Sequence, residues 1–120
     1  MRDVREFSNW DLVNNFITYV WGSVLRTSVT DRMPASVWAE DDTDTIEYIS
    51  ELSRRAKNRS DYVVSKCEAY IKFMWSLGRR RGKMQRWTIN DWEPVDAERN
   101  KYKRIILSVI SNDTTKGEQQ

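Results

Sequence analysis

The chain has 120 residues, of which 39% are hydrophobic and 32% charged, with only four Gly and two Pro. This length fits one ordinary domain, and the scarcity of helix-breaking residues favours long helices. A single Cys and no His exclude an intrachain disulfide, a His-containing zinc site and Ser–His or Cys–His nucleophile pairs. No apolar run approaches the roughly 18 residues of a membrane span, and the charged amino terminus is unlike a signal peptide, so we expect a soluble, intracellular protein of the cytoplasm with no membrane association.

Charge is distributed unevenly along the chain. The formal net charge is +2, but residues 1–50 carry four basic and nine acidic side chains, whereas residues 51–120 carry sixteen basic and nine acidic ones. Within residues 54–86 there are eleven Arg or Lys and only two acidic side chains. This basic region indicates an anionic partner, either nucleic acid or an acidic protein.

The first helix is predicted within residues 7–26. Ser8 is a natural N-cap, Asp11 occupies the third helical position, and Phe7 and Leu12 are placed to form a hydrophobic staple. The apolar stripe at three- and four-residue spacings comprises Trp10, Val13, Ile17, Val20, Trp21 and Val24.

The second helix is predicted from about Thr45 to Lys57, with Asp44 as its N-cap. Its apolar stripe comprises Ile46, Ile49, Leu52 and Ala56. The preceding residues 30–43 give the weakest signal, and the stretch "SVWAE" is compatible with a short extended piece.

The third helix is predicted to begin at Ser60 and the last near Pro94, which suits a first helical turn. The third has an apolar arc wider than half its circumference, so we expect a central helix that touches several neighbours and buries Cys67 as a structural thiol. The sequence therefore predicts an all-α fold, a small bundle of about four helices with a basic loop between the last two. We expect a single helical domain over 1–112 and a flexible C-terminal tail over 113–120.

The loop between the last two helices carries the first candidate site. One interpretation is structural, because cations at a helix carboxyl end complement the dipole and Gly82 suits the helix end. The other is that a basic loop contacts phosphates, since a dipole needs only one or two cations and this loop has five, with a Trp that can stack on bases. The candidate residues are Arg79, Arg80, Arg81, Lys83, Arg86 and Trp87.

A second basic cluster comprises Arg54, Arg55, Lys57 and Arg59, at the junction of the second and third helices. A solvated surface is the alternative to nucleic-acid contact here. The two clusters lie at opposite ends of one predicted helix and would be about 30 Å apart.

The segment "IEYISELSRRAKNRSDYVVSKCEAYIKF" resembles the two helices of ribbon-helix-helix repressors, with a polar turn and a Ser cap between them. The resemblance covers about a quarter of the chain and implies that "SVWAEDD" forms a DNA-reading strand. Glu40, Asp41 and Asp42 would repel phosphate in that strand, so the family is not assigned.

Carboxylates offer one route to an enzyme, because Glu47 and Glu51 could share a face of the second helix, and Asp61 and Glu68 are seven residues apart on the third, so a Mg²⁺ site between the two helices is geometrically possible. An ordinary exposed acidic surface is the favoured interpretation, and no glycine-rich phosphate loop or paired catalytic motif is present. We therefore predict a protein without enzymatic activity, catalytic residues, metal or cofactor.

Six Trp and five Tyr support a competing hypothesis, since Trp, Tyr and Arg are enriched at protein interfaces. Trp21 and Trp75 are the candidate interface residues of a homo-oligomer. The sequence thus predicts a non-enzymatic binding protein that contacts nucleic-acid backbone, or alternatively a protein–protein interaction module such as an inhibitor, adaptor or self-assembling subunit that uses its aromatic helical faces.

Overall fold

The computed structural model describes residues 3–30, 35–81 and 89–118, and in these ranges the chain is helical with no strand. The principal helices are α1 (Asn9–Thr30), α3 (Thr43–Ala56), α4 (Ser60–Arg81) and α5 (Ile89–Glu118). Shorter elements complete the chain: the 3₁₀ helices η1 (Val4–Glu6) and η2 (Lys57–Arg59), and the helix α2 (Ala35–Asp41). The predicted all-α bundle is confirmed.

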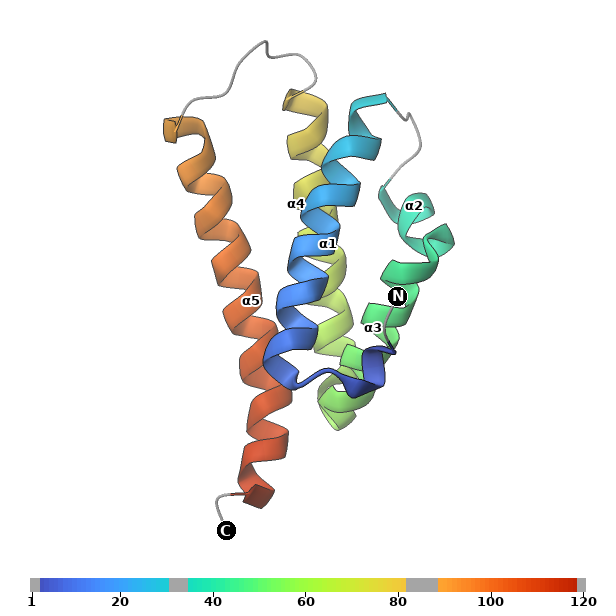
Figure 1. Cartoon of the computed structure of the whole chain (residues 1–120), viewed down its shortest axis with the longest axis vertical. Helices are drawn as coiled ribbons and strands as arrows, with labels where there is room; N and C mark the ends of the chain where they lie inside the picture. Colours follow the sequence, from blue (N-terminus) through green and yellow to red (C-terminus); the bar gives the residue numbers. More distant parts are fainter. Residues whose placement is uncertain (1–2, 31–34, 82–88, 119–120) are drawn as a thin grey trace.

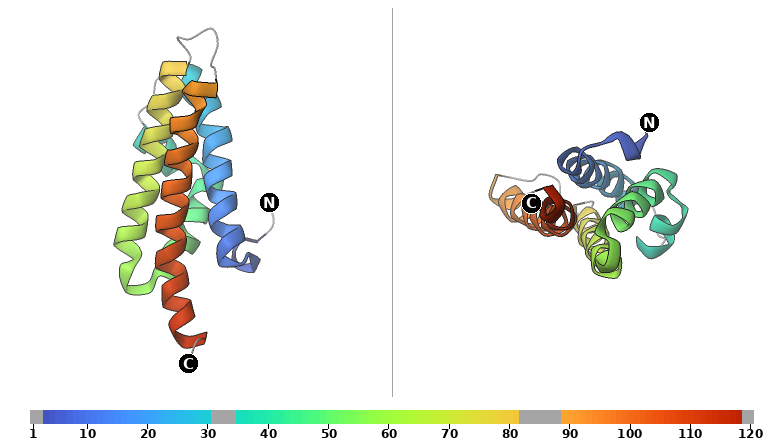
Figure 2. Two further views of the ribbon diagram at one scale, coloured as in Figure 1. Left: turned by 90° about the vertical axis from the view of Figure 1, so that its left-hand side faces the viewer. Right: turned by 90° about the horizontal axis from the view of Figure 1, so that it is seen from below.

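The helices α1 and α4 run in the same direction through the middle of the bundle, and α5 returns beside them (Figure 1). The views in Figures 1 and 2 place α5 on one side of the α1–α4 pair and α2 with α3 on the other. α4 packs against all four other α-helices, as its broad apolar arc predicted.

The start of α1 follows the sequence prediction. The Oγ of Ser8 accepts a hydrogen bond from the backbone N–H of Asp11 at 3.1 Å, and the Ser8 carbonyl accepts from the N–H of Leu12 at 2.8 Å. Ser8 is therefore the N-cap, which satisfies backbone donors that the first turn leaves without helical partners.

Helix α3 begins two residues before the predicted position, and its cap is Asp42 rather than Asp44. One carboxylate oxygen of Asp42 accepts from the backbone N–H of Thr45 at 3.1 Å, from the Thr45 hydroxyl at 2.8 Å and from the Tyr19 hydroxyl at 2.7 Å. The hydrogen bond from Tyr19 is a tertiary contact with α1, so it could not be predicted from the residues near Asp42 in the sequence.

The buried face of α3 is also rotated from the predicted one. Tyr48 is buried against the rings of Phe16 and Tyr19, while Ile46 stays 43% exposed. Leu52 and Ala56 are fully buried as predicted. Aromatic packing with α1 thus decides which side of α3 faces the core.

Two further expectations are corrected. The stretch "SVWAE" lies in the helix α2, so it is not extended, and residues 35–41, where a ribbon-helix-helix fold would need its strand, are helical. Helix α5 begins at Ile89, and Pro94 lies inside it. A proline so near the start removes only one helical hydrogen bond, and Trp92 and Val95 hold this turn in place by packing on the bundle.

The core is built from apolar side chains of all the principal helices. Tyr70 of α4 is fully buried, and its hydroxyl donates to the carbonyl of Ile17 in α1 at 2.8 Å. The predicted burial of Cys67 is confirmed, and burial raises the pKa of its thiol. The boundary between domain and tail at residue 112 stays a prediction.

Candidate nucleic-acid interface

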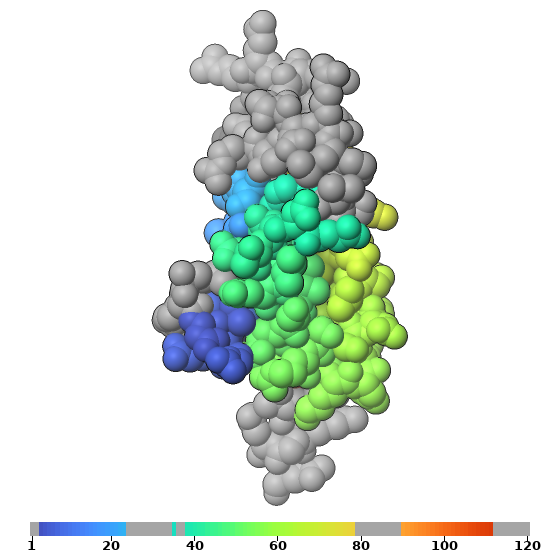
Figure 3. Space-filling model, turned by 90° about the vertical axis from the view of Figure 1, so that its right-hand side faces the viewer, coloured from blue at the N-terminus to red at the C-terminus, as the bar shows by residue number. Residues whose placement is uncertain are grey.

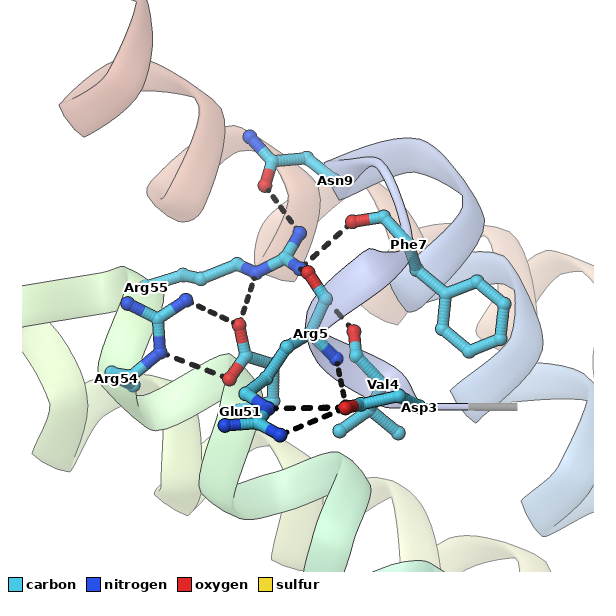
Figure 4. Close-up of polar contacts among 8 residues, drawn as sticks. All are labelled: Asp3, Val4, Arg5, Phe7, Asn9, Glu51, Arg54 and Arg55. Carbon is cyan, nitrogen blue, oxygen red and sulfur yellow. Dashed lines mark hydrogen bonds and ion pairs between the residues drawn. The ribbon is translucent and has the colours of Figure 1, made fainter. Parts of the chain in front are cut away.

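Arg55, one of the predicted nucleic-acid-binding residues, has a structural position instead. Its side chain is 11% exposed, and its Nε donates to Glu51 at 2.7 Å. Nη1 donates to the Asn9 side chain at 3.0 Å, and Nη2 donates to the Phe7 carbonyl at 2.7 Å, as Figure 4 shows. All three guanidinium nitrogens are therefore engaged within the chain, so Arg55 connects the N-terminal segment to α3 and is not available to a phosphate.

Arg54 shares the Glu51 carboxylate with Arg55 but points outward, with a side chain 65% exposed. Hydrogen bonds from Arg54 and Arg55 lower the pKa of Glu51 against the opposing effect of burial. Glu51, considered above as a magnesium ligand, is thus the anionic partner of two arginines.

The chain turns sharply after α3. Lys57 has a positive φ of 54°, a backbone conformation that non-glycine residues adopt rarely. Lys57, Asn58 and Arg59 are all exposed at this corner. The exposed part of the predicted 54–59 cluster therefore consists of Arg54, Lys57 and Arg59.

The second predicted cluster lies at the other end of α4. Residues Arg79, Arg80 and Arg81 form the last turn of α4, where cations complement the helix dipole. Lys83, Arg86 and Trp87 lie outside the described residues. With 22 residues in α4, the two clusters are roughly 33 Å apart along the helix axis, as expected from the sequence.

Two exposed aromatic side chains lie beside cations, of which only Arg59 belongs to a cluster predicted from the sequence. Tyr62 is 40% exposed, with the Arg59 guanidinium 5.0 Å and the Lys66 ammonium 5.3 Å from its ring centroid. Trp10 is 51% exposed, with the Lys103 ammonium 4.7 Å from its ring centroid. These distances are those of cation–π contacts.

Helix geometry places the first of these groups on the flank of α4 away from α2 and α3. Val64 and Glu68 line a groove shared with α2 and α3. Tyr62 and Lys66 each precede one of them by two residues, which corresponds to about 200° around a helix. They therefore face away from the groove, toward the side on which Figure 2 shows α5 beside α4.

Helix α5 contributes further cations, from the run "KYKR" at 101–104. Arg104 is exposed, and Lys103 bridges to α1 through Trp10 and through the Asn14 side chain at 3.3 Å. Lys101 pairs with Glu98 at 3.1 Å, so its charge is partly compensated. We call the following set the basic face: Trp10, Arg59, Tyr62, Lys66, Lys103 and Arg104.

The sequence offered a signal for part of the basic face. The "KYKR" run is a cluster of three cations in the sequence, and Tyr62 and Lys66 are four residues apart on one predicted helix, a spacing that brings two side chains together. The pairing of Trp10 with Lys103 depends on how α1 packs against α5, which no local pattern reveals.

The two candidate interface tryptophans both pack against helices of their own chain. Trp75 is 3% exposed, and its ring lies 6.0 Å from that of Trp38. Trp21 is half-buried, in edge contact with Trp92 at 6.1 Å and with the Arg99 guanidinium 4.3 Å from its ring. The broad apolar arc of α4 is thus largely covered by other helices of the same chain.

Among the residues that the structure describes, no group of three or more acidic, Cys or His side chains is placed to hold a metal ion. None of the described helices has the length and apolar character needed to cross a membrane. Cys67 is buried with a raised thiol pKa, which is unlike a reactive cysteine.

Comparison of the chain with protein-family models, with curated proteins and with solved structures gives no match.

Proposed function

We propose that this chain is a non-enzymatic helical protein that binds the phosphate backbone of nucleic acid through the basic face. The supporting observation is that exposed aromatic rings lie beside cations at two places, with Tyr62 near Arg59 and Lys66 on α4, and Trp10 of α1 near Lys103 of α5. Lys and Arg contact phosphates, and exposed rings beside them can stack on unpaired bases.

The arginines at the end of α4 form a second contact region in this proposal. Arg79, Arg80 and Arg81 are at the opposite end of α4 from Arg59, so one ligand reaches both regions only if it spans most of the length of the bundle. The proposal does not depend on a homo-oligomer, because most of the described apolar side chains of α1 and α4 are buried within the chain.

The test is equilibrium binding of labelled single-stranded and duplex DNA and RNA across a range of salt concentrations. Affinity should fall steeply as salt rises, with about 0.9 of log–log slope for each duplex phosphate neutralised. Lys66→Gln and Lys103→Gln should each reduce both affinity and slope, on every sequence tested.

Lys72→Gln is the matched control, because Lys72 is an exposed lysine of the same helix that lines the groove on its other flank. It should leave the slope unchanged. Absence of binding even at 50 mM salt would overturn the proposal. Capture of an acidic protein that depends on Lys66 and Lys103 would then favour the alternative, a protein–protein interaction module.

A further inference from the structure

The flank of α4 opposite the basic face contains an apolar groove of about 310 Å³ between α2, α3 and α4. Figure 3 shows this side of the molecule, with α3 running between η1 and α4. Its apolar lining comprises Ala35, Ala39, Ile46, Ile49, Val64 and Ile71. Ile46 is 43% exposed, although it is a large apolar side chain.

The exposure of Ile46 follows from the packing of α3. Tyr48 turns inward against Phe16 and Tyr19, with ring centroids 6.1 and 5.7 Å apart. Ile46 precedes Tyr48 by two residues, so it must point about 200° away, toward solvent. The same rotation leaves Ile49 only half-buried.

The charges around this groove are predominantly acidic. Glu40 and Glu68 line it from opposite sides, on α2 and α4, and Lys72 is the one cation in its lining. Asp41, next to Glu40 on α2, is exposed as well. These three carboxylates form no ion pair with another residue that the structure describes, in contrast to Glu51, which holds two arginines. Glu47 lies with Arg54 in an adjoining hollow that shares Ile46 and Ser50 with the groove.

We infer that this groove docks a cationic amphipathic helix of a partner protein. An amphipathic helix inserts side chains spaced at i, i+3, i+4 and i+7 into an apolar groove. Lys or Arg residues at the edges of that stripe would lie beside Glu40 and Glu68. The acidic side chains of the groove would therefore contribute to the choice of partner together with its apolar side chains. The site is separate from the basic face, and it does not depend on nucleic-acid binding.

The probe is a labelled 14-residue helical peptide of Leu, Lys and Ala, with Leu at i, i+3, i+4 and i+7, titrated by fluorescence anisotropy. Two control peptides are a scrambled version of the same composition and a version with Glu in place of Lys. The amphipathic Lys peptide should bind at least tenfold more tightly than either. Equal binding of the scrambled peptide would show non-specific charge attraction and overturn the inference.

Substitutions locate the site. Ile46→Ser and Glu68→Gln should each weaken peptide binding by fivefold or more, whereas Tyr62→Ser, at a residue of similar exposure on the other flank of α4, should have no effect. Unchanged binding by both groove variants would also overturn the inference. Thermal melting checks that each variant is folded.

Light scattering of the free protein tests whether a second copy of the chain, rather than a partner protein, occupies the groove. We expect a monomer at the concentrations of the titration. A wild-type dimer that Ile46→Lys converts to a folded monomer would mean that a second copy fills the groove, and the inference would be wrong.

Discussion

The Nε of Arg55 lies 2.7 Å from a carboxylate oxygen of Glu51, one helical turn before it on α3. Glu51 is 4% exposed, and Arg55 extends from this pair to the segment before α1. Because a charge left without its partner in such a position is costly, this pair fixes how the N-terminal segment packs on α3.

Replacement of Arg55 should therefore destabilise the fold much more than replacement of its neighbour Arg54. Arg55→Met leaves the Glu51 carboxylate with one exposed partner and removes the bond to the Phe7 carbonyl, so we expect a loss of about 3 kcal/mol in the free energy of unfolding. Arg54→Met, at a side chain 65% exposed, should cost less than about 1 kcal/mol. Urea denaturation of both variants measures the difference, and equal losses would mean that Arg55 has no structural role beyond its charge.

The Glu51 carboxylate also predicts a pH dependence of stability. Hydrogen bonds from Arg54 and Arg55 lower its pKa in the folded state below the ordinary value of 4.5. The unfolded chain therefore binds this proton more readily, so the stabilisation is fully present above pH 4.5 and is lost as the pH falls through the lower folded pKa.

The measurement is the free energy of unfolding of the wild type and of Glu51→Gln at about pH 6 and pH 3. The advantage of the wild type should shrink at the lower pH, because its carboxylate approaches the neutral form that Gln mimics. A constant difference between the two proteins would show that Glu51 titrates alike in the folded and unfolded chains.

The features that could be predicted from the sequence are those that depend on neighbours in the chain. The cap at Ser8, the burial of Cys67 and the central position of α4 all follow from short-range pattern and the breadth of an apolar arc. The cap at Asp42 and the inward turn of Tyr48 could not be predicted, because both depend on contacts with α1.

The distinction between contacts of chain neighbours and tertiary contacts also explains which candidate site residues were predicted correctly. Positive charge alone grouped Arg55 with Arg54 and Arg59 as a nucleic-acid-binding residue. In the structure, Arg55 instead donates hydrogen bonds to residues 46 to 51 positions earlier in the chain. Conversely, Lys103 and Trp10 are 93 residues apart and meet only through the packing of α1 with α5. Counting cations identifies a basic region, whereas the fold decides which of its members reach solvent.

The buried hydroxyl of Tyr70 provides a test of the α1–α4 packing. Tyr70→Phe removes the bond to the Ile17 carbonyl, and we expect a loss of about 1 kcal/mol in the free energy of unfolding. Tyr62→Phe, at an exposed tyrosine of the same helix, should change stability little. Chemical denaturation distinguishes the two, and equal effects would indicate that the Tyr70 hydroxyl adds nothing to the packing.

The last prediction concerns the two basic regions in nucleic-acid binding. The Lys103→Gln/Arg104→Gln variant removes charge from the basic face on α5, and Arg80→Ala/Arg81→Ala removes charge at the end of α4. Tyr102 packs against Tyr70, and Tyr70 is ten residues before Arg80 on α4, so these two groups are roughly 15 Å apart along the helix axis. Because screening at physiological salt acts over about 8 Å, their effects on the free energy of binding should be additive on a long duplex.

On an oligonucleotide too short to span the bundle, only one region can bind at a time, so neither double variant should abolish binding. Salt titrations on short and long duplexes provide the measurement, with the decrease in log–log slope reporting how many phosphate contacts each region loses. A long duplex that responds only to Arg80→Ala/Arg81→Ala would remove the α5 cations from the interface. A response only to Lys103→Gln/Arg104→Gln would instead leave the arginines at the end of α4 as partners of the helix dipole.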